Sequence, residues 1–132
     1  MKGINKKLDD ACRDYVKDRD NHTCRWCGAG DLIKRNCQWA HIIPRSNGFR
    51  LRWNPRNSMT LCFSCHEKRW HESGEGRQWF DEEFPEEIEY LLSQKVLGTL
   101  KFTKSDKEEL LEAFENGTPE QWFKERVDVS SR

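Results

Sequence analysis

The sequence predicts a small α+β fold in which a short strand pair and a helix form the core, one helix precedes this core, and further helices extend from it. Three observations lead to that prediction. Helix start and stop signals mark the beginning and the end of the 132-residue chain. A short apolar alternation lies in the middle. Two Cys-x-x-Cys pairs flank this middle part, and a chain with only 35% hydrophobic residues is lean enough to need such a staple.

Residues 5–20 predict the N-terminal helix. Leu8, Cys12, Tyr15 and Val16 recur at helical spacing, whereas charged residues occupy most of the remaining positions. The helix therefore has one apolar side that is suited to packing.

The middle of the chain predicts two strands and a helix. Residues 37–43, CQWAHII, alternate as a short strand does, and the Asn-Gly pair at 47–48 is a turn signal at or near which two strands would be joined. A further helix is expected to begin at Cys62 and to end at Gly74 and Gly76.

The remaining residues predict three helices. Pro85 opens the first of them and Gly98 closes it. Ser105 and Glu108 stand in a capping-box relation at the start of the second, and a similar start signal at 118–121 opens the third. The residues expected to pack these helices against one another are Leu91, Leu92, Leu110, Leu111, Phe114, Trp122 and Phe123.

We divide the chain into residues 1–80, the core with its N-terminal helix, and residues 81–132, an acidic helical extension packed on or appended to that core. The formal net charge is zero, but residues 24–72 carry nine Lys/Arg against three Asp/Glu, and residues 73–132 carry eight against fifteen. A basic segment followed by an acidic one fits nucleic-acid contact in the first. The alternative is that both are ordinary solvated surfaces.

The sequence predicts a cytoplasmic protein without a membrane partner. No apolar run is long enough to span a bilayer, and the N-terminus lacks the apolar stretch of a signal peptide. In a reducing compartment, paired cysteines more often bind metal than form disulfides.

The two cysteine pairs have the spacing of a zinc site. Cys24 and Cys27 form the first pair and Cys62 and Cys65 the second, with 34 residues between the inner cysteines. Two residues between thiolates let both sulfurs reach one ion, and two such pairs complete a tetrahedral set. Gly28 suits the tight turn after the first pair. Four sulfurs leave no open position, so this Zn²⁺ would be structural; the alternative is two unrelated or redox-active pairs.

Several motifs between and around the cysteine pairs carry a family resemblance. AHIIP at 40–44, NSMTLC at 57–62 and CFSCH at 62–66 follow one another, and CRWCG is preceded by RDYVKDRDNHT. With RLRWNPRNSMTLCFSCHEKRWHE they resemble the HNH endonuclease family, in particular small phage-encoded members with cysteine pairs at both ends. The likeness covers roughly residues 10–85. It implies the ββα-metal core of that family, two strands and a helix around one metal ion. It also implies hydrolysis of DNA to 5′-phosphate and 3′-hydroxyl ends.

The resemblance implies a role for three residues. His41 would be the general base that takes a proton from the attacking water, which an imidazole with a pKa of about 6.5 can do. Asn57 would tie the intervening loop to the site through its amide. His66 would bind the catalytic divalent ion, Mg²⁺, Mn²⁺ or another metal, beside the scissile phosphate. The respective alternatives are a hydrogen-bonded histidine at a strand end, a turn cap, and a donor to the zinc thiolates.

The chain departs from the family pattern at two positions. Many members carry Asp or His before the base and a second histidine four residues after the first, where this chain has Ala40 and Trp70. His71 follows His66 by five residues, about 140° around a regular helix, so sharing an ion would require a distorted last turn. With such a distortion His71 could contact the metal or the phosphate, so it is a second candidate ligand of the catalytic ion. Gln38 could lean into the space at Ala40, although amide oxygens are weak ligands.

Basic residues gather beside these motifs. Guanidinium and ammonium groups suit phosphate oxygens and would position a duplex without reading its sequence. The candidate nucleic-acid-binding residues are Arg45, Arg50, Arg52, Arg56, Lys68 and Arg69. Trp53 or Trp70 could stack against bases, with core packing as the alternative.

Two hypotheses of different classes follow. The first is a metal-dependent HNH endonuclease that nicks or cuts DNA with low sequence specificity, of phage origin and acting in recombination or genome packaging. In that case it would work in the bacterial host cytoplasm, where its acidic helices could bind a terminase or a recombination protein. The second is a non-catalytic, zinc-stapled nucleic-acid or protein adaptor with a degenerate HNH site.

Overall fold

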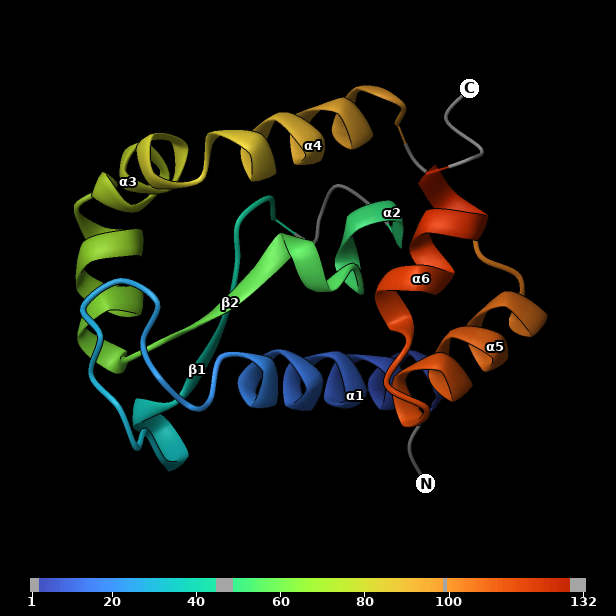
Figure 1. Ribbon diagram of the computed structural model, residues 1–132, viewed down its shortest axis with the longest axis horizontal. Helices are drawn as coiled ribbons and strands as arrows, with labels where there is room; N and C mark the ends of the chain where they lie inside the picture. The colour runs from blue at the N-terminus through green and yellow to red at the C-terminus, as the bar shows by residue number, and fades with distance from the viewer. Residues whose placement is uncertain (1–2, 45–48, 99, 129–132) are drawn as a thin grey trace.

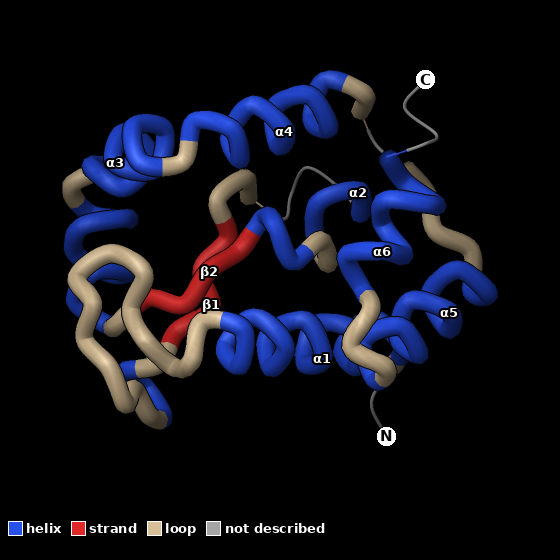
Figure 2. Tube along the Cα trace, in the orientation of Figure 1, coloured by secondary structure: helices blue, strands red, loops and turns tan. Residues whose placement is uncertain are grey.

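The computed structural model describes residues 3–44, 49–98 and 100–128 (Figures 1 and 2). Along the chain its elements are α1 (Ile4–Arg19), a 3₁₀ turn (Lys34–Asn36), β1 (Gln38–His41), α2 (Phe49–Arg52), a 3₁₀ turn (Pro55–Asn57), β2 (Ser58–Leu61), a π-helix (Ser64–Glu72), α3 (Glu75–Glu83), α4 (Pro85–Val96), α5 (Lys104–Glu115), α6 (Pro119–Phe123) and a C-terminal π-helix (Lys124–Asp128). Among these described helices, none is both long and apolar enough to cross a membrane.

The two strands form an antiparallel pair at the centre of the molecule. Gln38 lies opposite Leu61, and His41 lies opposite Ser58. Helices surround the pair: Figure 1 shows α1 along its lower side, α4 above it, and α5 and α6 at the right. All four residues of β2 are consequently buried. The predicted α+β fold is confirmed, whereas the turn expected at 47–48 lies outside the described residues.

Two hydrophobic clusters fill the interior. The strand cluster consists of Cys24, Leu32, Cys37, Ala40, Ile42, Ile43, Leu51, Met59, Leu61, Cys62, Cys65, Phe80, Ile88 and Leu91. The helix cluster consists of Leu8, Cys12, Val16, Trp53, Phe102, Leu110, Phe114, Phe123 and Val127. Each cluster draws residues from both sides of the expected boundary at residue 80, so α1 shares a core with the C-terminal helices. The domain division itself stays a prediction.

A buried carboxylate joins the end of α1 to the strand pair. The Asp20 side chain is 2% exposed and accepts hydrogen bonds from Arg19 Nε, Arg25 Nη1 and the backbone N–H of Thr60, at 2.8–2.9 Å. Burial alone would raise the pKa of this carboxyl, but the Arg19 guanidinium, the Thr60 N–H and Arg25 together lower it below its usual range. The charged form of Asp20 therefore holds the chain where it leaves α1 for the first cysteine pair.

Three local expectations for the helices need correction. Thr103 and Asp106 form the capping box of α5, each accepting a hydrogen bond from the other's backbone N–H at 3.0 and 2.9 Å, instead of Ser105 and Glu108. A separate helix, α3, begins between the two glycines that were expected only to end a helix, with Gly74 as its N-cap and Gly76 inside it. Leu92 is 39% exposed, and Leu91 lies in the strand cluster, whereas the residues expected to pack with them belong to the helix cluster or lie against it.

Candidate functional site

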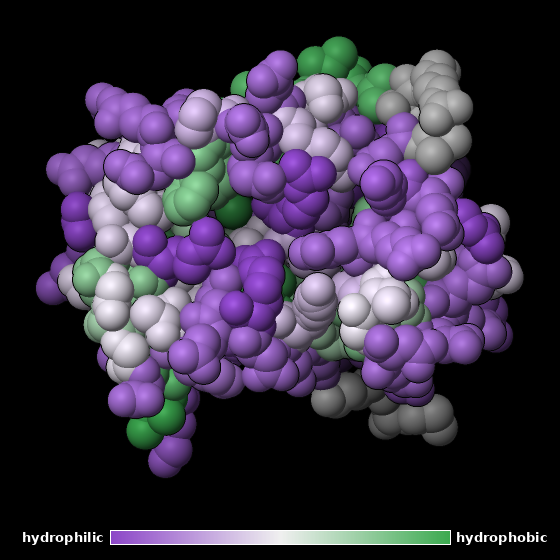
Figure 3. Space-filling model, viewed as in Figure 1, coloured by the Kyte–Doolittle hydropathy of each residue, from purple (hydrophilic) through white to green (hydrophobic). Residues whose placement is uncertain are grey.

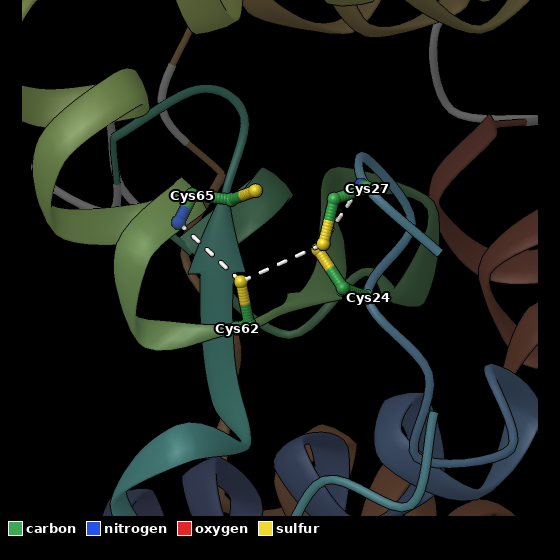
Figure 4. A group of neighbouring side chains, drawn as sticks. All are labelled: Cys24, Cys27, Cys62 and Cys65. Carbon is green, nitrogen blue, oxygen red and sulfur yellow. Dashed lines mark hydrogen bonds between the residues drawn. The ribbon is translucent and has the colours of Figure 1, made fainter. Parts of the chain in front are cut away.

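The four paired cysteines converge on one point. Cys24 and Cys27 come from the loop after α1, and Cys62 and Cys65 come from the end of β2 and the start of the π-helix (Figure 4). Their sulfurs all lie within 4.8 Å of one another, and the Cys27 and Cys62 sulfurs are 3.8 Å apart. A tetrahedral zinc ion with bonds of about 2.3 Å spaces its sulfurs by about 3.8 Å. The geometry therefore fits a tetrahedral zinc ion.

The acid–base state of the thiols also fits a cation. Burial raises the pKa of Cys24, but surrounding N–H groups, those of Cys27 and Cys62 foremost, bring it down to about 7. Burial and the neighbouring thiols raise the pKa of Cys62 and that of Cys65. Four thiolates this close repel one another unless a cation neutralises them, so metal binding would release protons from the cluster.

Aromatic side chains cover the cysteine cluster and attach α3 to it. Trp26, from the first cysteine pair, stacks on Trp79 of α3 with centroids 4.7 Å apart. The Arg69 guanidinium lies 3.9 Å from the centre of the Trp26 ring and donates to the Cys65 sulfur at 3.9 Å. Gly28 adopts a φ of +82°, the left-handed conformation that the turn after the pair requires.

A second site lies beside the cysteine cluster, between β1 and the π-helix. It is an open pocket of about 540 Å³. Its lining residues are Trp39, His41, Ile42, Pro44, His66, Trp70 and His71, and we call it the histidine pocket. Three of the four histidines in the chain therefore line one pocket, although they lie up to thirty positions apart in the sequence.

The π-helical winding of Ser64–Glu72 brings His71 next to His66. In a π-helix the backbone hydrogen bond spans five residues, as between Ser73 N–H and the Lys68 carbonyl at 3.0 Å, so residues five apart lie roughly above one another. The Nε2 atoms of His66 and His71 are 3.0 Å apart. This winding supplies the distortion that a shared ion requires of a histidine at position 71.

The two imidazoles present a donor set that fits a divalent ion. Two nitrogens that bind one ion at right angles with bonds of about 2.1 Å lie about 3.0 Å apart. His66 Nδ1 lies 2.6 Å from the Gln38 side-chain oxygen, which turns the Nε2 edge of the ring toward His71. Burial lowers the pKa of His66 and the neighbouring His71 lowers it further, whereas Glu67 raises it. The ring is therefore disposed to stay neutral, the form that binds metal.

His41 is half-buried in the histidine pocket, with its orientation set by the loop behind it. Its Nε2 lies 3.2 Å from the Arg52 carbonyl, and its ring lies against Trp39 at a centroid distance of 4.4 Å. A carbonyl only accepts hydrogen bonds, so Nε2 carries the proton of the neutral ring and the lone pair is on Nδ1. This tautomer has the basic nitrogen that proton abstraction requires.

Asn57 is fully buried and holds the segment that follows β1. Its side-chain oxygen accepts from the Ile43 N–H at 2.8 Å, and its amide nitrogen donates to the carbonyls of Ile43 and Leu51 at 2.9 and 3.2 Å. These bonds use both ends of the amide. The side chain is thereby committed to the backbone of the loop.

Position 40 contributes nothing to the histidine pocket. Ala40 is fully buried in the strand cluster, opposite Met59. Gln38 does not fill the space at Ala40 as a ligand, because its side-chain oxygen bonds His66 instead. Neither the contact between Gln38 and His66 nor the place of Trp39 in the histidine pocket was predicted from the sequence. The strand register, which places residue 38 beside the cysteine pair that begins the π-helix, is the signal that would have suggested the first.

Three of the proposed phosphate-binding arginines are engaged inside the fold. Arg50 is only 6% exposed, and its Nε donates to a backbone carbonyl after α4 at 3.0 Å. Arg52 forms two hydrogen bonds with Asp9 at 2.8 and 3.1 Å. Arg56 forms two with Glu87, both of 2.9 Å. Their charges are balanced or buried by segments distant in sequence, which argues against their binding DNA phosphates.

The other candidates for contact with nucleic acid divide differently. Lys68 is exposed and lines a shallow surface pocket that also includes His71. Arg69 is exposed but stacks on Trp26, and Arg45 lies outside the described residues. Trp53 is fully buried in the helix cluster, so it packs the core and does not stack on bases.

Comparison with known proteins agrees with this geometry. The HNH endonuclease family model matches residues 24–72, which contain both cysteine pairs and all three pocket histidines. A protein named "Probable HNH endonuclease" from Lactococcus phage SK1 is 38% identical over 77 residues, which is 55% of this chain and 80% of that relative. No solved structure gives a significant match.

Proposed function

Because the chain belongs to the HNH endonuclease family, we propose that it is a metal-dependent DNA endonuclease whose reaction takes place in the histidine pocket. The observation that carries the proposal is the convergence of His41, His66 and His71 on that pocket. A general base and a pair of imidazole ligands are the parts that metal-assisted phosphodiester hydrolysis needs.

In this mechanism His41 accepts a proton at Nδ1 from the attacking water. The water oxygen then forms a bond to phosphorus, and the bond from phosphorus to the 3′ oxygen breaks. The leaving oxygen takes a proton from solvent, which gives 5′-phosphate and 3′-hydroxyl ends. His66 and His71 would hold a divalent ion, Mg²⁺ or Mn²⁺, which when bound offsets the charge on the phosphate and on the leaving oxygen. Two nitrogens alone leave room for water and a phosphate oxygen around such an ion.

Asn57 serves this mechanism by holding the backbone behind the base. Its amide fixes Ile43, two residues after His41, and Leu51, next to the residue whose carbonyl orients the His41 ring. Loss of these bonds would let the base move relative to the phosphate, and misplacement by about 1 Å costs on the order of 100-fold in rate.

In this proposal the protein binds DNA with little preference for sequence. Exposed Lys68 beside His71 contacts backbone phosphates, and such contacts position the duplex without reading its sequence. We further propose a phage role in recombination or genome packaging, which the phage relative supports, with the acidic helices as the surface for a terminase or recombination protein.

A plasmid-nicking assay tests the proposed function. Zinc-loaded protein is incubated with supercoiled plasmid and Mg²⁺, Mn²⁺ or Ni²⁺, beside the variant His41→Ala. His22→Ala is the matched control, because His22 is exposed and outside the histidine pocket. We expect metal-dependent nicking by the wild type and by the control, and little by His41→Ala. Equal, negligible nicking by all three proteins, with plasmid still bound, would instead favour the adaptor hypothesis.

A further inference from the structure

We propose that Gln38 is a positioning residue for the catalytic metal site, fixing the proton of His66 on Nδ1 so that Nε2 is the ligand atom. The inference rests on the proposed function, since it takes His66 and His71 as the ligands. It adds a residue of β1 to a site whose metal-binding side chains both come from the π-helix.

The hydrogen-bond network determines which end of the Gln38 amide faces His66. Its Nε2 donates to the Arg35 carbonyl at 2.8 Å, and that carbonyl can only accept. The opposite end, the oxygen Oε1, is therefore the atom 2.6 Å from His66 Nδ1. An amide oxygen only accepts, so the neutral His66 ring carries its proton on Nδ1 and its lone pair on Nε2.

Among the residues that the structure describes, no other group within hydrogen-bond distance competes for His66 Nδ1. The nearest carboxylate oxygen, on Glu67, is 3.8 Å away. Solvent reaches the ring poorly, since the His66 side chain is 15% exposed. Gln38 is thus the group that decides the tautomer of His66, and His71 Nε2, 3.0 Å away, donates its proton to the His66 lone pair. Because His71 is exposed, that proton can move to its other ring nitrogen by exchange with water when an ion binds.

The position of Gln38 is itself rigid. It lies opposite Leu61 in the strand pair, and Leu61 is followed directly by Cys62 of the cysteine cluster. The distance between Gln38 and the first turn of the π-helix is therefore fixed by the strand register and by the four-sulfur cluster. In a site without a ligand at Ala40, the orientation and basicity of His66 bear a larger share of metal affinity.

Mn²⁺ titration of the full-length, zinc-loaded protein tests the inference without reference to cleavage. Thiolates prefer zinc to Mn²⁺, so the added ion reports on the nitrogen site. We expect Gln38→Leu to weaken Mn²⁺ binding 10- to 100-fold. Gln38→Glu should restore it, because a carboxylate also accepts from Nδ1. Gln78→Leu is the matched control, since Gln78 is exposed on α3 and its amide bonds only Glu82 among the contacts described.

Nitrogen-15 NMR of the imidazole rings gives a second readout that a merely structural role would not change. We expect the wild type to show the Nδ1-protonated tautomer of His66 before Mn²⁺ is added, and Gln38→Leu to show a mixture of both tautomers. Unchanged Mn²⁺ affinity and an unchanged tautomer in Gln38→Leu would overturn the inference. If His66→Ala bound Mn²⁺ as tightly as the wild type, the ligand assignment in the proposed function would fail as well. Loss of binding in His66→Ala alone would overturn only the role of Gln38.

Discussion

The cysteine cluster and the histidine pocket both draw side chains from the π-helix, but they differ in how many positions around an ion they leave open. Cys65 and His66 are neighbours at the start of the π-helix, and the first belongs to a set of four sulfurs within 4.8 Å of one another, whereas the second faces a single further imidazole. Four sulfurs saturate an ion and leave no position for substrate. Two imidazoles leave most positions open. The comparison separates a closed site that stabilises the fold from an open site suited to chemistry.

The closed site matters for stability because the protein has little apolar surface to bury (Figure 3). The surface seen there is mostly hydrophilic, with few hydrophobic side chains, and the interior is divided into two modest clusters. A small domain with so little apolar surface to bury depends on additional cross-links. The cysteine cluster connects the loop after α1, the end of β2 and the π-helix, and through Trp79 it also holds α3.

The largest expected effect separates the two sites by stability. Cys62→Ser, or removal of zinc by a chelator, should unfold the strand pair and the π-helix, because zinc binding contributes about 10–16 kcal/mol of apparent free energy in small zinc modules. His71→Ala should leave the thermal unfolding midpoint nearly unchanged. Circular dichroism melting curves of the wild type and of both variants measure this. A Cys62→Ser variant that melts like the wild type would contradict the assignment of the stabilising role to the cysteines.

The second effect separates the sites by activity. His41→Ala should lower the rate of plasmid nicking by about 10²- to 10⁴-fold, since it removes the proposed general base. Its free energy of unfolding should fall by only about 1–2 kcal/mol, since the substitution removes the hydrogen bond to the Arg52 carbonyl and the ring contact with Trp39 but no zinc ligand. Nicking rates and denaturant melts on the same preparations test both statements. A large loss of stability together with activity would mean that the histidine pocket is also structural.

The third effect is a pH dependence of stability. It comes from Asp20, the buried carboxylate that precedes the first cysteine pair. The pKa of Asp20 is lower in the folded protein than in the unfolded chain, so its contribution to stability is complete above its ordinary pKa of about 3.9 and is lost as the pH falls through the folded value. Asp20→Asn should therefore cost about 2–3 kcal/mol of unfolding free energy at neutral pH. The difference between variant and wild type should shrink below about pH 4. Urea melts across pH measure it, and a difference that grows in acid would contradict the sign.

The smallest effect lies outside both sites. Thr103→Ala removes the N-cap of α5 and should cost about 1 kcal/mol of unfolding free energy. Ser105→Ala is the control, because Ser105 lies inside the helix and does not cap it. If Ser105→Ala lost as much unfolding free energy as Thr103→Ala, the assignment of the N-cap to Thr103 would be wrong. Neither variant should alter Mn²⁺ binding, since α5 does not line the histidine pocket.

Sequence alone predicted the features that depend on spacing along the chain. Two cysteine pairs of equal spacing predicted the cysteine cluster. The spacing of apolar residues predicted α1 and β1, and a proline at the start and a glycine at the end predicted α4. The capping box of α5 was placed two residues late because Thr103 and Ser105 each have an acidic residue three positions on, and only the packing of the helix decides between them. Spacing is therefore reliable where one pattern fits and ambiguous where two overlap.

Features that depend on winding or on distant partners could not be predicted in this way. The meeting of His66 and His71 requires a π-helix, and no simple residue pattern distinguishes that winding from a regular helix. Arg52 and Arg56 look like phosphate ligands in sequence, but their carboxylate partners come from α1 and α4. The position of the Gln38 amide likewise results from the strand register and is not visible in local sequence.

The most direct test of the histidine pocket is the position of a bound ion. Crystals of the zinc-loaded protein soaked in Mn²⁺ would locate the ion by anomalous scattering. We expect a manganese peak within bonding distance of Nε2 of both His66 and His71, on the same side as His41, and a separate zinc peak among the four sulfurs. A manganese peak bound elsewhere, with the two imidazoles unliganded, would contradict this expectation.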